Sequence, residues 1–232
     1  MENSHVIANK QTKGKCLFCG RDMTRGGMIR HLPSCEQRRQ AIDEKEYDRR
    51  IEQDLYHLQV SDPYSSDYWL NLEINGTAKL ADFDDYLRAI WLECCDHMSQ
   101  FSDEGEYGRE VAMTQRVFNV FKPGVEMTHI YDFGSSTVTV IKMVGKRRGM
   151  PLTSNPVFLM ARNNPPEYIC EECDKPASWF DMEALFNMGQ FICLCNEHAE
   201  SDPDGYTDEY IEIVNSPRTG VCGYTGPAEP PY

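Results

Sequence analysis

Apolar and polar residues alternate over residues 68–75, and this period of two predicts a β-strand. One face of the strand receives Tyr68, Leu70, Leu72 and Ile74. The opposite face receives Trp69, Asn71 and Glu73. Asn75-Gly76, directly after these residues, is a strong turn signal. We therefore expect a strand with one apolar face, ended by a tight turn.

A helical period follows the turn. Apolar residues fall on one helical stripe, namely Leu80, Phe83, Leu87, Ile90 and Trp91. Residues 126–149 predict two strands that meet at Gly134-Ser135, and residues 156–163 predict a further short strand. The state of residues 109–118 is left open by the pattern. These elements indicate a mixed body that begins near Leu55.

The composition favours a folded, intracellular protein. The chain has 232 residues, of which 41% are hydrophobic, enough for one sizeable core with small appendages. No window approaches the roughly 18–20 consecutive apolar residues of a membrane span. The polar start lacks the apolar stretch of a secretory signal. We expect a cytoplasmic location without membrane contact, where ten cysteines indicate metal ligation more than disulfides.

Residues 16–35 contain a cysteine and histidine pattern that predicts a zinc site. Cys16 and Cys19 form a Cys-x2-Cys knuckle, and Gly20 is available to relieve its tight turn. His31 and Cys35 lie four residues apart, which places them on one face of a helix. The spacing is nearly that of a zinc finger whose last histidine is replaced by cysteine.

Residues 170–198 predict a second zinc site, with a spacing near that of a zinc ribbon. Cys170 and Cys173 form one knuckle, and Cys195 with His198 forms another after a gap of 21 residues. Cys193 is an alternative ligand in place of Cys195. Both sites offer four ligands dominated by thiolates, so they are expected to be closed and structural, not catalytic. The expected cofactors are thus two structural zinc ions.

Charge is distributed unevenly along the chain. The net charge is −14, yet residues 10–39 carry eight basic and two acidic side chains, a net +6. Arg21, Arg25 and Arg30 lie between the ligands of the first site, and guanidinium groups suit phosphates and guanine edges. Contact of this segment with nucleic acid, contact with protein and a purely structural role are all left open. The second site lies among acidic residues, which favours a protein partner.

The run Cys94-Cys95-Asp96-His97 raises the question of an enzyme. Adjacent residues on a helix diverge by about 100°, so the run predicts no catalytic dyad but a helix end with a buried thiol and a capping polar residue. A hydrolase that uses His129 or His97 is a further alternative. The sequence contains no glycine-rich phosphate loop, nucleophile elbow or His-Glu-x-x-His motif.

Three segments, residues 80–101, 131–144 and 214–226, together resemble the plasmid pRiA4b open-reading-frame-three-like family. Within them, the run Trp-Leu-Glu-Cys-Cys at residues 91–95 and Asn-Ser-Pro-Arg at residues 215–218 carry most of the likeness. The resemblance implies a compact α+β domain over about residues 55–162, with a mostly antiparallel sheet packed by helices. It also implies a setting in plasmids or transposon-like elements. The biochemical role of the family is not established.

The sequence thus predicts an α+β protein with small zinc modules at both ends. Its expected parts are a basic zinc finger (1–40), a charged helical linker (41–54), the α+β domain (55–162) and a zinc-ribbon-like module with a tail (163–232). The leading hypothesis is a zinc-stabilised, non-enzymatic adaptor of a mobile-element or defence-related system. The alternatives are a nucleic-acid-binding protein that acts through the basic finger and a hydrolase of unknown substrate.

Overall fold

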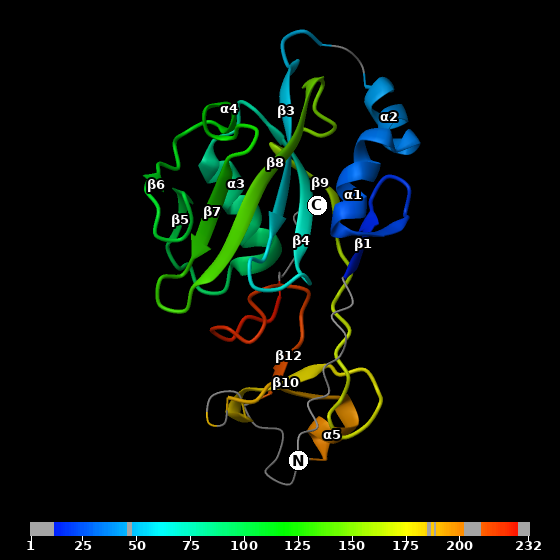
Figure 1. Ribbon diagram of the computed structural model, residues 1–232, viewed down its shortest axis with the longest axis vertical. Helices are drawn as coiled ribbons and strands as arrows, with labels where there is room; N and C mark the ends of the chain where they lie inside the picture. Colours follow the sequence, from blue (N-terminus) through cyan, green and yellow to red (C-terminus); the bar gives the residue numbers. More distant parts are fainter. Residues whose placement is uncertain (1–11, 46–47, 185–186, 188, 202–209, 227–232) are drawn as a thin grey trace.

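The computed structural model describes residues 12–45, 48–184, 187, 189–201 and 210–226. An antiparallel sheet of nine strands has the order β2-β1-β9-β4-β3-β8-β7-β5-β6 (Figure 1). The strands are β1 (Lys13–Cys16), β2 (Asp22–Thr24), β3 (Gln53–Ser61), β4 (Trp69–Asn75), β5 (Ser99–Asp103), β6 (Glu110–Val111), β7 (Glu126–Tyr131), β8 (Thr137–Gly149) and β9 (Val157–Asn163). The expected α+β class with a mostly antiparallel sheet is confirmed.

One face of this sheet is covered by a helix that the sequence predicts. The helix α3 (Leu80–Leu87) continues as a π-helical turn, η2 (Arg88–Leu92), and its stripe packs on the apolar face of β4. Asp82 accepts a hydrogen bond from the Lys79 backbone N–H at 2.7 Å and so caps the helix start. Among the described residues, every helix is too short or too polar to cross a membrane.

The strand β3 is central to the sheet but was not predicted as a strand. It pairs with β4 on one side and with β8 on the other. His57, Gln59 and Ser61 are polar yet buried, and they alternate with the apolar Tyr56, Leu58 and Val60, so the strand has a period of two and both of its faces are covered. The sheet also has β5, for which no strand was predicted, whereas β7, β8 and β9 match the expected strands.

The N-terminal cysteine segment is built into the sheet. Strand β1 pairs with β2 and, on its other edge, with β9. The helix α1 (Arg25–His31), the 3-10 turn η1 (Leu32–Ser34) and the helix α2 (Glu36–Asp43) follow. Met28 and Leu32 pack against Trp69 of β4. Trp69 lies on the strand face opposite to Leu70, so this segment covers the sheet face that α3 leaves open.

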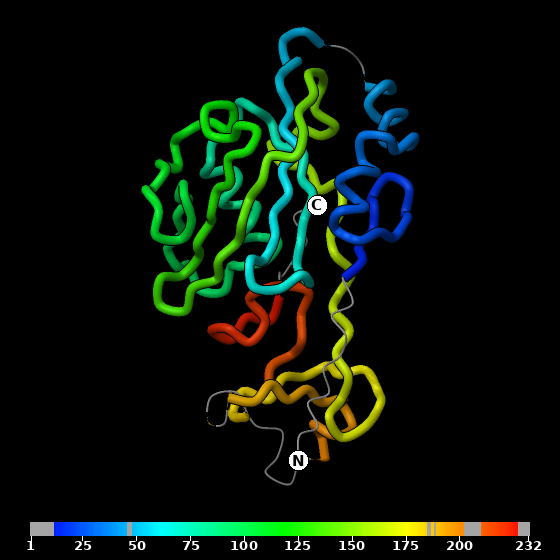
Figure 2. The backbone as a smooth tube through the Cα atoms, in the orientation of Figure 1, coloured from blue at the N-terminus to red at the C-terminus, as the bar shows by residue number. Residues whose placement is uncertain are grey.

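The C-terminal cysteine segment forms a separate lobe. The strands β10 (Trp179–Asp181), β11 (Ile192–Leu194) and β12 (Tyr210–Glu212) form a three-stranded antiparallel sheet, with α5 (Asn196–Glu200) beside it. The chain then returns to the body as a tail, residues 213–226, without helix or strand (Figure 2). Ser216 of this tail donates a hydrogen bond to the Trp91 carbonyl oxygen at 2.6 Å.

Candidate metal centres

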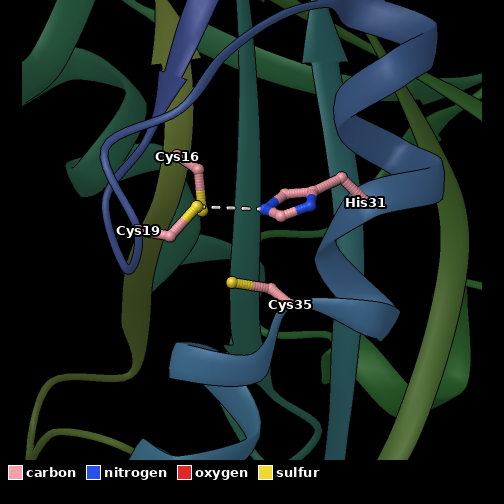
Figure 3. A group of neighbouring side chains, drawn as sticks. All are labelled: Cys16, Cys19, His31 and Cys35. Carbon is pink, nitrogen blue, oxygen red and sulfur yellow. Dashed lines mark hydrogen bonds between the residues drawn. The ribbon is translucent and has the colours of Figure 1, made fainter.

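The N-terminal cluster consists of Cys16, Cys19, His31 and Cys35. Its four ligand atoms all lie within 4.8 Å of one another, and the Cys19 Sγ is 3.3 Å from the His31 Nε2 (Figure 3). Each ligand stands at an element end: the end of β1, the following turn, the end of α1 and the start of α2. Gly20 has φ +71°, a left-handed value that favours glycine, as expected for the knuckle. The predicted ligands therefore converge.

Burial shapes the chemistry of this cluster. Cys16 and Cys35 are almost fully buried, beside Met28, Leu32 and Trp69. Burial raises the pKa of the Cys16 thiol to about 11, which disfavours its thiolate unless a cation compensates the charge. Burial, together with the nearby Arg21, lowers the pKa of His31 and keeps its imidazole neutral, the form that binds a metal.

The C-terminal cluster consists of Cys170, Cys173, Cys195 and His198, again within 4.8 Å. The His198 Nδ1 is 3.3 Å from the Cys170 Sγ and 3.5 Å from the Cys195 Sγ. The Sγ atoms of Cys173 and Cys195 are 3.9 Å apart. A tetrahedral ion with bonds of about 2.0–2.3 Å places neighbouring ligand atoms roughly 3.5–3.8 Å apart. The distances between the ligand atoms of the C-terminal cluster therefore suit a tetrahedral ion.

The choice between Cys193 and Cys195 is resolved by local structure. Cys195 is the residue before α5, which turns its thiol toward His198 of that helix. Cys193 lies in β11, opposite Phe180 of β10, and is not a member of the cluster. Burial raises the pKa of the Cys193 thiol to about 11. It is a buried thiol outside the cluster, whereas Cys195 is a member of the cluster.

The electrostatics of the C-terminal cluster differ from those of the N-terminal one. Burial disfavours the Cys170 thiolate, but backbone N–H groups of Cys195 and Glu172 and the His198 imidazole outweigh it and lower the pKa of this thiol to about 6. At neutral pH, Cys170 is therefore already largely in the thiolate form that metal ligation requires.

The basic residues of the N-terminal segment divide into two groups. Arg21 and Arg30 are exposed and Arg25 is half-buried, and none of the three has a carboxylate partner among the described residues. Arg38 is instead buried and donates to the Glu73 carboxylate of β4 at 2.9 Å. Glu73 also receives Arg147, so one buried carboxylate joins α2 to the sheet. Lys10 lies outside the described residues.

The candidate hydrolase residue His129 is a core residue. Its side chain is fully buried in β7, and its Nε2 lies 2.6 Å from the Asp84 Oδ1 of α3. A surface depression of about 450 Å³ beside α4 (Val117–Val120) has no histidine or cysteine in its described lining. His129 therefore has no access to a substrate in this arrangement.

The run at residues 94–97 follows a helix end, as its sequence predicts, but neither of its thiols is buried as expected. The helical segment ends at Leu92, and Asp96 takes a positive φ of 58°. The chain turns back, and the side chains of Cys94, Cys95 and His97 converge with Cys222 of the tail. We call these four residues the third cluster. Sequence reasoning missed it, although four cysteines were left outside the two predicted ligand sets.

Comparison with known proteins supports no family and no function for the chain. No family model matches the chain, and no curated protein matches it. A solved structure with some likeness is a protein of unknown function, MM3350, from Methanosarcina mazei Go1. It is 14% identical, the match covers 48% of this chain and 68% of that one, and the TM-score is 0.40. The resemblance to the plasmid pRiA4b family stays a prediction.

Proposed function

We propose that this chain is a binding protein in which two structural zinc ions hold the N-terminal and C-terminal clusters. The observation that carries this proposal is that each cluster brings three thiols and one imidazole within 4.8 Å. This ligand set is typical of structural zinc, and four protein ligands leave no position for a reacting water. The ions then stabilise the fold, and the function of the protein is to bind a partner.

Charge favours a protein partner with basic groups at the C-terminal lobe. Exposed carboxylates among its described residues include those of Glu171, Glu172, Asp174, Glu183, Glu197 and Glu200. Phe191 is 60% exposed on the same lobe, and an exposed aromatic ring beside charged groups is common at protein interfaces. The family resemblance supports a setting in a mobile-element or defence-related system.

Zinc content and partner capture together test this proposal. Cys16→Ser and Cys170→Ser should each remove one zinc ion per chain, as measured by elemental analysis, because each destroys one four-ligand set. Cys193→Ser is the matched control, since this thiol lies outside the clusters, and it should retain all zinc. The loaded protein should capture a partner that Cys170→Ser fails to capture. Unchanged zinc in both ligand variants, or no macromolecule bound in pull-down and gel-shift assays, would contradict the proposal.

A second candidate function is binding of nucleic acid through the N-terminal cluster. It is favoured by the exposed Arg21 and Arg30, which no described carboxylate neutralises. Binding through phosphate contacts weakens steeply as salt rises. Arg21→Ala with Arg30→Ala should therefore reduce affinity and flatten the salt dependence, whereas Arg49→Ala, an exposed control elsewhere, should change neither. Equal affinity of both variants for nucleic acid would exclude this function.

A further inference from the structure

The third cluster joins two segments that are far apart in the sequence. Cys94, Cys95 and His97 follow the helical end at Leu92, and Cys222 comes from the tail. We propose that the third cluster binds a zinc ion and that this ion fastens the C-terminal tail to the α+β body. The inference is independent of the two terminal clusters, because it concerns other ligands and another contact.

The distances within the third cluster suit one tetrahedral ion. The Cys95 Sγ is 3.4 Å from the Cys94 Sγ and 3.6 Å from the Cys222 Sγ. The His97 Nε2 is 3.0 Å from the Cys95 Sγ and 3.5 Å from the Cys222 Sγ. All four ligand atoms lie within 4.8 Å of one another, as they do in the other two clusters. The ligand composition, three thiols and one imidazole, is also the same.

The surrounding contacts place the segments that carry these ligands near one another. Glu93 accepts hydrogen bonds from the Asp96 backbone N–H and from the Tyr131 hydroxyl, which fixes the turn that carries His97. On the tail, Ser216 bonds to the Trp91 carbonyl and to the Arg218 backbone N–H. Both halves of the cluster are therefore anchored to the same end of η2.

Arg218 places a buried guanidinium beside the third cluster. Its side chain is fully buried, donates to the Asp132 carboxylate at 2.7 Å and lies 3.4 Å from the Cys94 Sγ. Three thiolates and a neutral imidazole around a divalent ion leave a net charge of −1, and the Arg218 guanidinium, which also pairs with Asp132, donates a charge-assisted hydrogen bond toward the Cys94 sulfur. Its guanidinium also stacks over the Tyr131 ring, 4.7 Å from the centroid. The buried Arg218 guanidinium beside these thiols favours their thiolate form, which metal ligation requires.

A third ligand set also accounts for the cysteine content of the chain. With it, nine of the ten cysteines belong to a three-thiol, one-histidine group, and Cys193 alone stands outside. Three thiols and an imidazole select a thiophilic ion such as zinc over calcium or magnesium. Binding converts the thiols to thiolates and releases their protons to solvent.

Metal counting on the full chain tests this proposal. The purified protein, reduced and then loaded with zinc, should hold three zinc ions per chain, and Cys222→Ser and Cys95→Ser should each hold two. Both positions are exposed, so these variants should keep the circular dichroism spectrum of the unsubstituted protein. Cys193→Ser is the control and should hold three. Titration with cobalt(II) should give thiolate-to-metal absorption that saturates at three ions, and at two in Cys222→Ser.

The alternatives give distinct results. Two ions in the unsubstituted protein, with unchanged content in Cys222→Ser, would overturn the third site and leave the two terminal sites standing. A disulfide between Cys95 and Cys222 in protein purified without oxidant, found by mass spectrometry, would also overturn it. The tail supplies a second measurement: removal of the third ion should raise proteolytic cleavage within residues 213–226 severalfold. Cleavage that does not change would contradict the fastening role.

Discussion

The N-terminal and C-terminal clusters contain the same kinds of ligand but stand in different surroundings. At the N-terminus, β1 belongs to the nine-stranded sheet, and the cluster packs on Trp69, Met160 and Ala161 of the body. At the C-terminus, the cluster lies in a lobe with its own three-stranded sheet. The small core of this lobe includes Leu194 and Ala199, with Trp179 packed against it.

The difference teaches what a structural ion does in each place. A short three-stranded sheet with a small apolar core cannot offset the conformational entropy of folding by burial alone. The N-terminal segment, in contrast, gains backbone pairing with β9 and apolar contact with a large body. We therefore expect the C-terminal lobe to depend on its ion for folding and the N-terminal segment to depend on it less.

The largest expected effect follows from loss of a ligand in the C-terminal lobe. Structural zinc contributes about 10–16 kcal/mol of apparent binding free energy in small modules, most of it used for folding. Cys170→Ser should unfold residues 168–200 while the body stays folded. Hydrogen exchange should then show loss of protection in β10 and β11 but not in β3 and β4.

Cys16→Ser provides the other half of this comparison. It should lose the N-terminal ion but keep protection in β1 and β9, because their pairing does not need the ion. If Cys16→Ser exposed β1 as completely as Cys170→Ser exposes β10, the two clusters would not differ in the way inferred above.

A substitution in the α+β body should affect metal binding at the N-terminal cluster but not at the C-terminal cluster. Trp69 is fully buried between β4 and the N-terminal segment, so Trp69→Ala should leave a cavity and lower the free energy of unfolding by about 3–5 kcal/mol. It should also weaken metal binding at the N-terminal cluster and leave the C-terminal cluster unchanged. Chemical denaturation and competition with a chelator measure the two effects. Equal weakening at both clusters would contradict the separation.

Acid should destabilise the α+β body through protonation of His57, which lies on the same sheet face as Trp69. His57 bonds to the Asn71 amide oxygen at 2.8 Å, and burial lowers its pKa from 6.5 to about 4. The unfolded chain takes up this proton below pH 6.5 but the folded chain does not, so stability falls between pH 6.5 and pH 4. The loss amounts to roughly 3 kcal/mol at the lower end.

The neighbouring charges and a matched variant make this test specific. Arg38 lowers the pKa of His57 further, whereas Glu73 and the bond to Asn71 raise it. His57→Gln lacks the titrating ring, so its stability should fall less over this range than that of the unsubstituted protein. Zinc release, followed in the same samples with a metal indicator, separates loss of ions from protonation of His57. Parallel pH curves for the two proteins would show that His57 contributes nothing.

Local patterns allowed much of this architecture to be predicted from the sequence. The alternation over residues 68–75 gave β4, and the stripe beginning at Leu80 gave α3, because each pattern depends on neighbours in the chain. Both four-ligand sets were predicted because a knuckle and a helical pair each place two ligands by local geometry. Strand β3 was missed although Tyr56, Leu58 and Val60 alternate with polar residues over residues 56–61, the same period of two that predicted β4.

Long-range contacts set the limit of such prediction. The third cluster depends on Cys222 meeting His97, 125 residues earlier, and no spacing rule connects them. The pairing of β1 with β9 is likewise a property of the folded sheet, so the N-terminal segment was expected as a finger and not as part of the body's sheet. Asp96 also reversed the chain where helical geometry was assumed.

The smallest expected effect comes from a substitution that tests whether the metal ion or a surface ion pair stabilises the C-terminal lobe. Lys175 forms an exposed ion pair with Glu197 at 2.6 Å, between the segments that carry Cys173 and Cys195. Exposed pairs contribute little, because solvent and salt screen them. Lys175→Met should therefore leave zinc content and thermal midpoint unchanged, and added salt should have no effect on the lobe. A marked fall in midpoint, comparable to that of Cys170→Ser, would mean that charge pairing rather than the ion holds this lobe together.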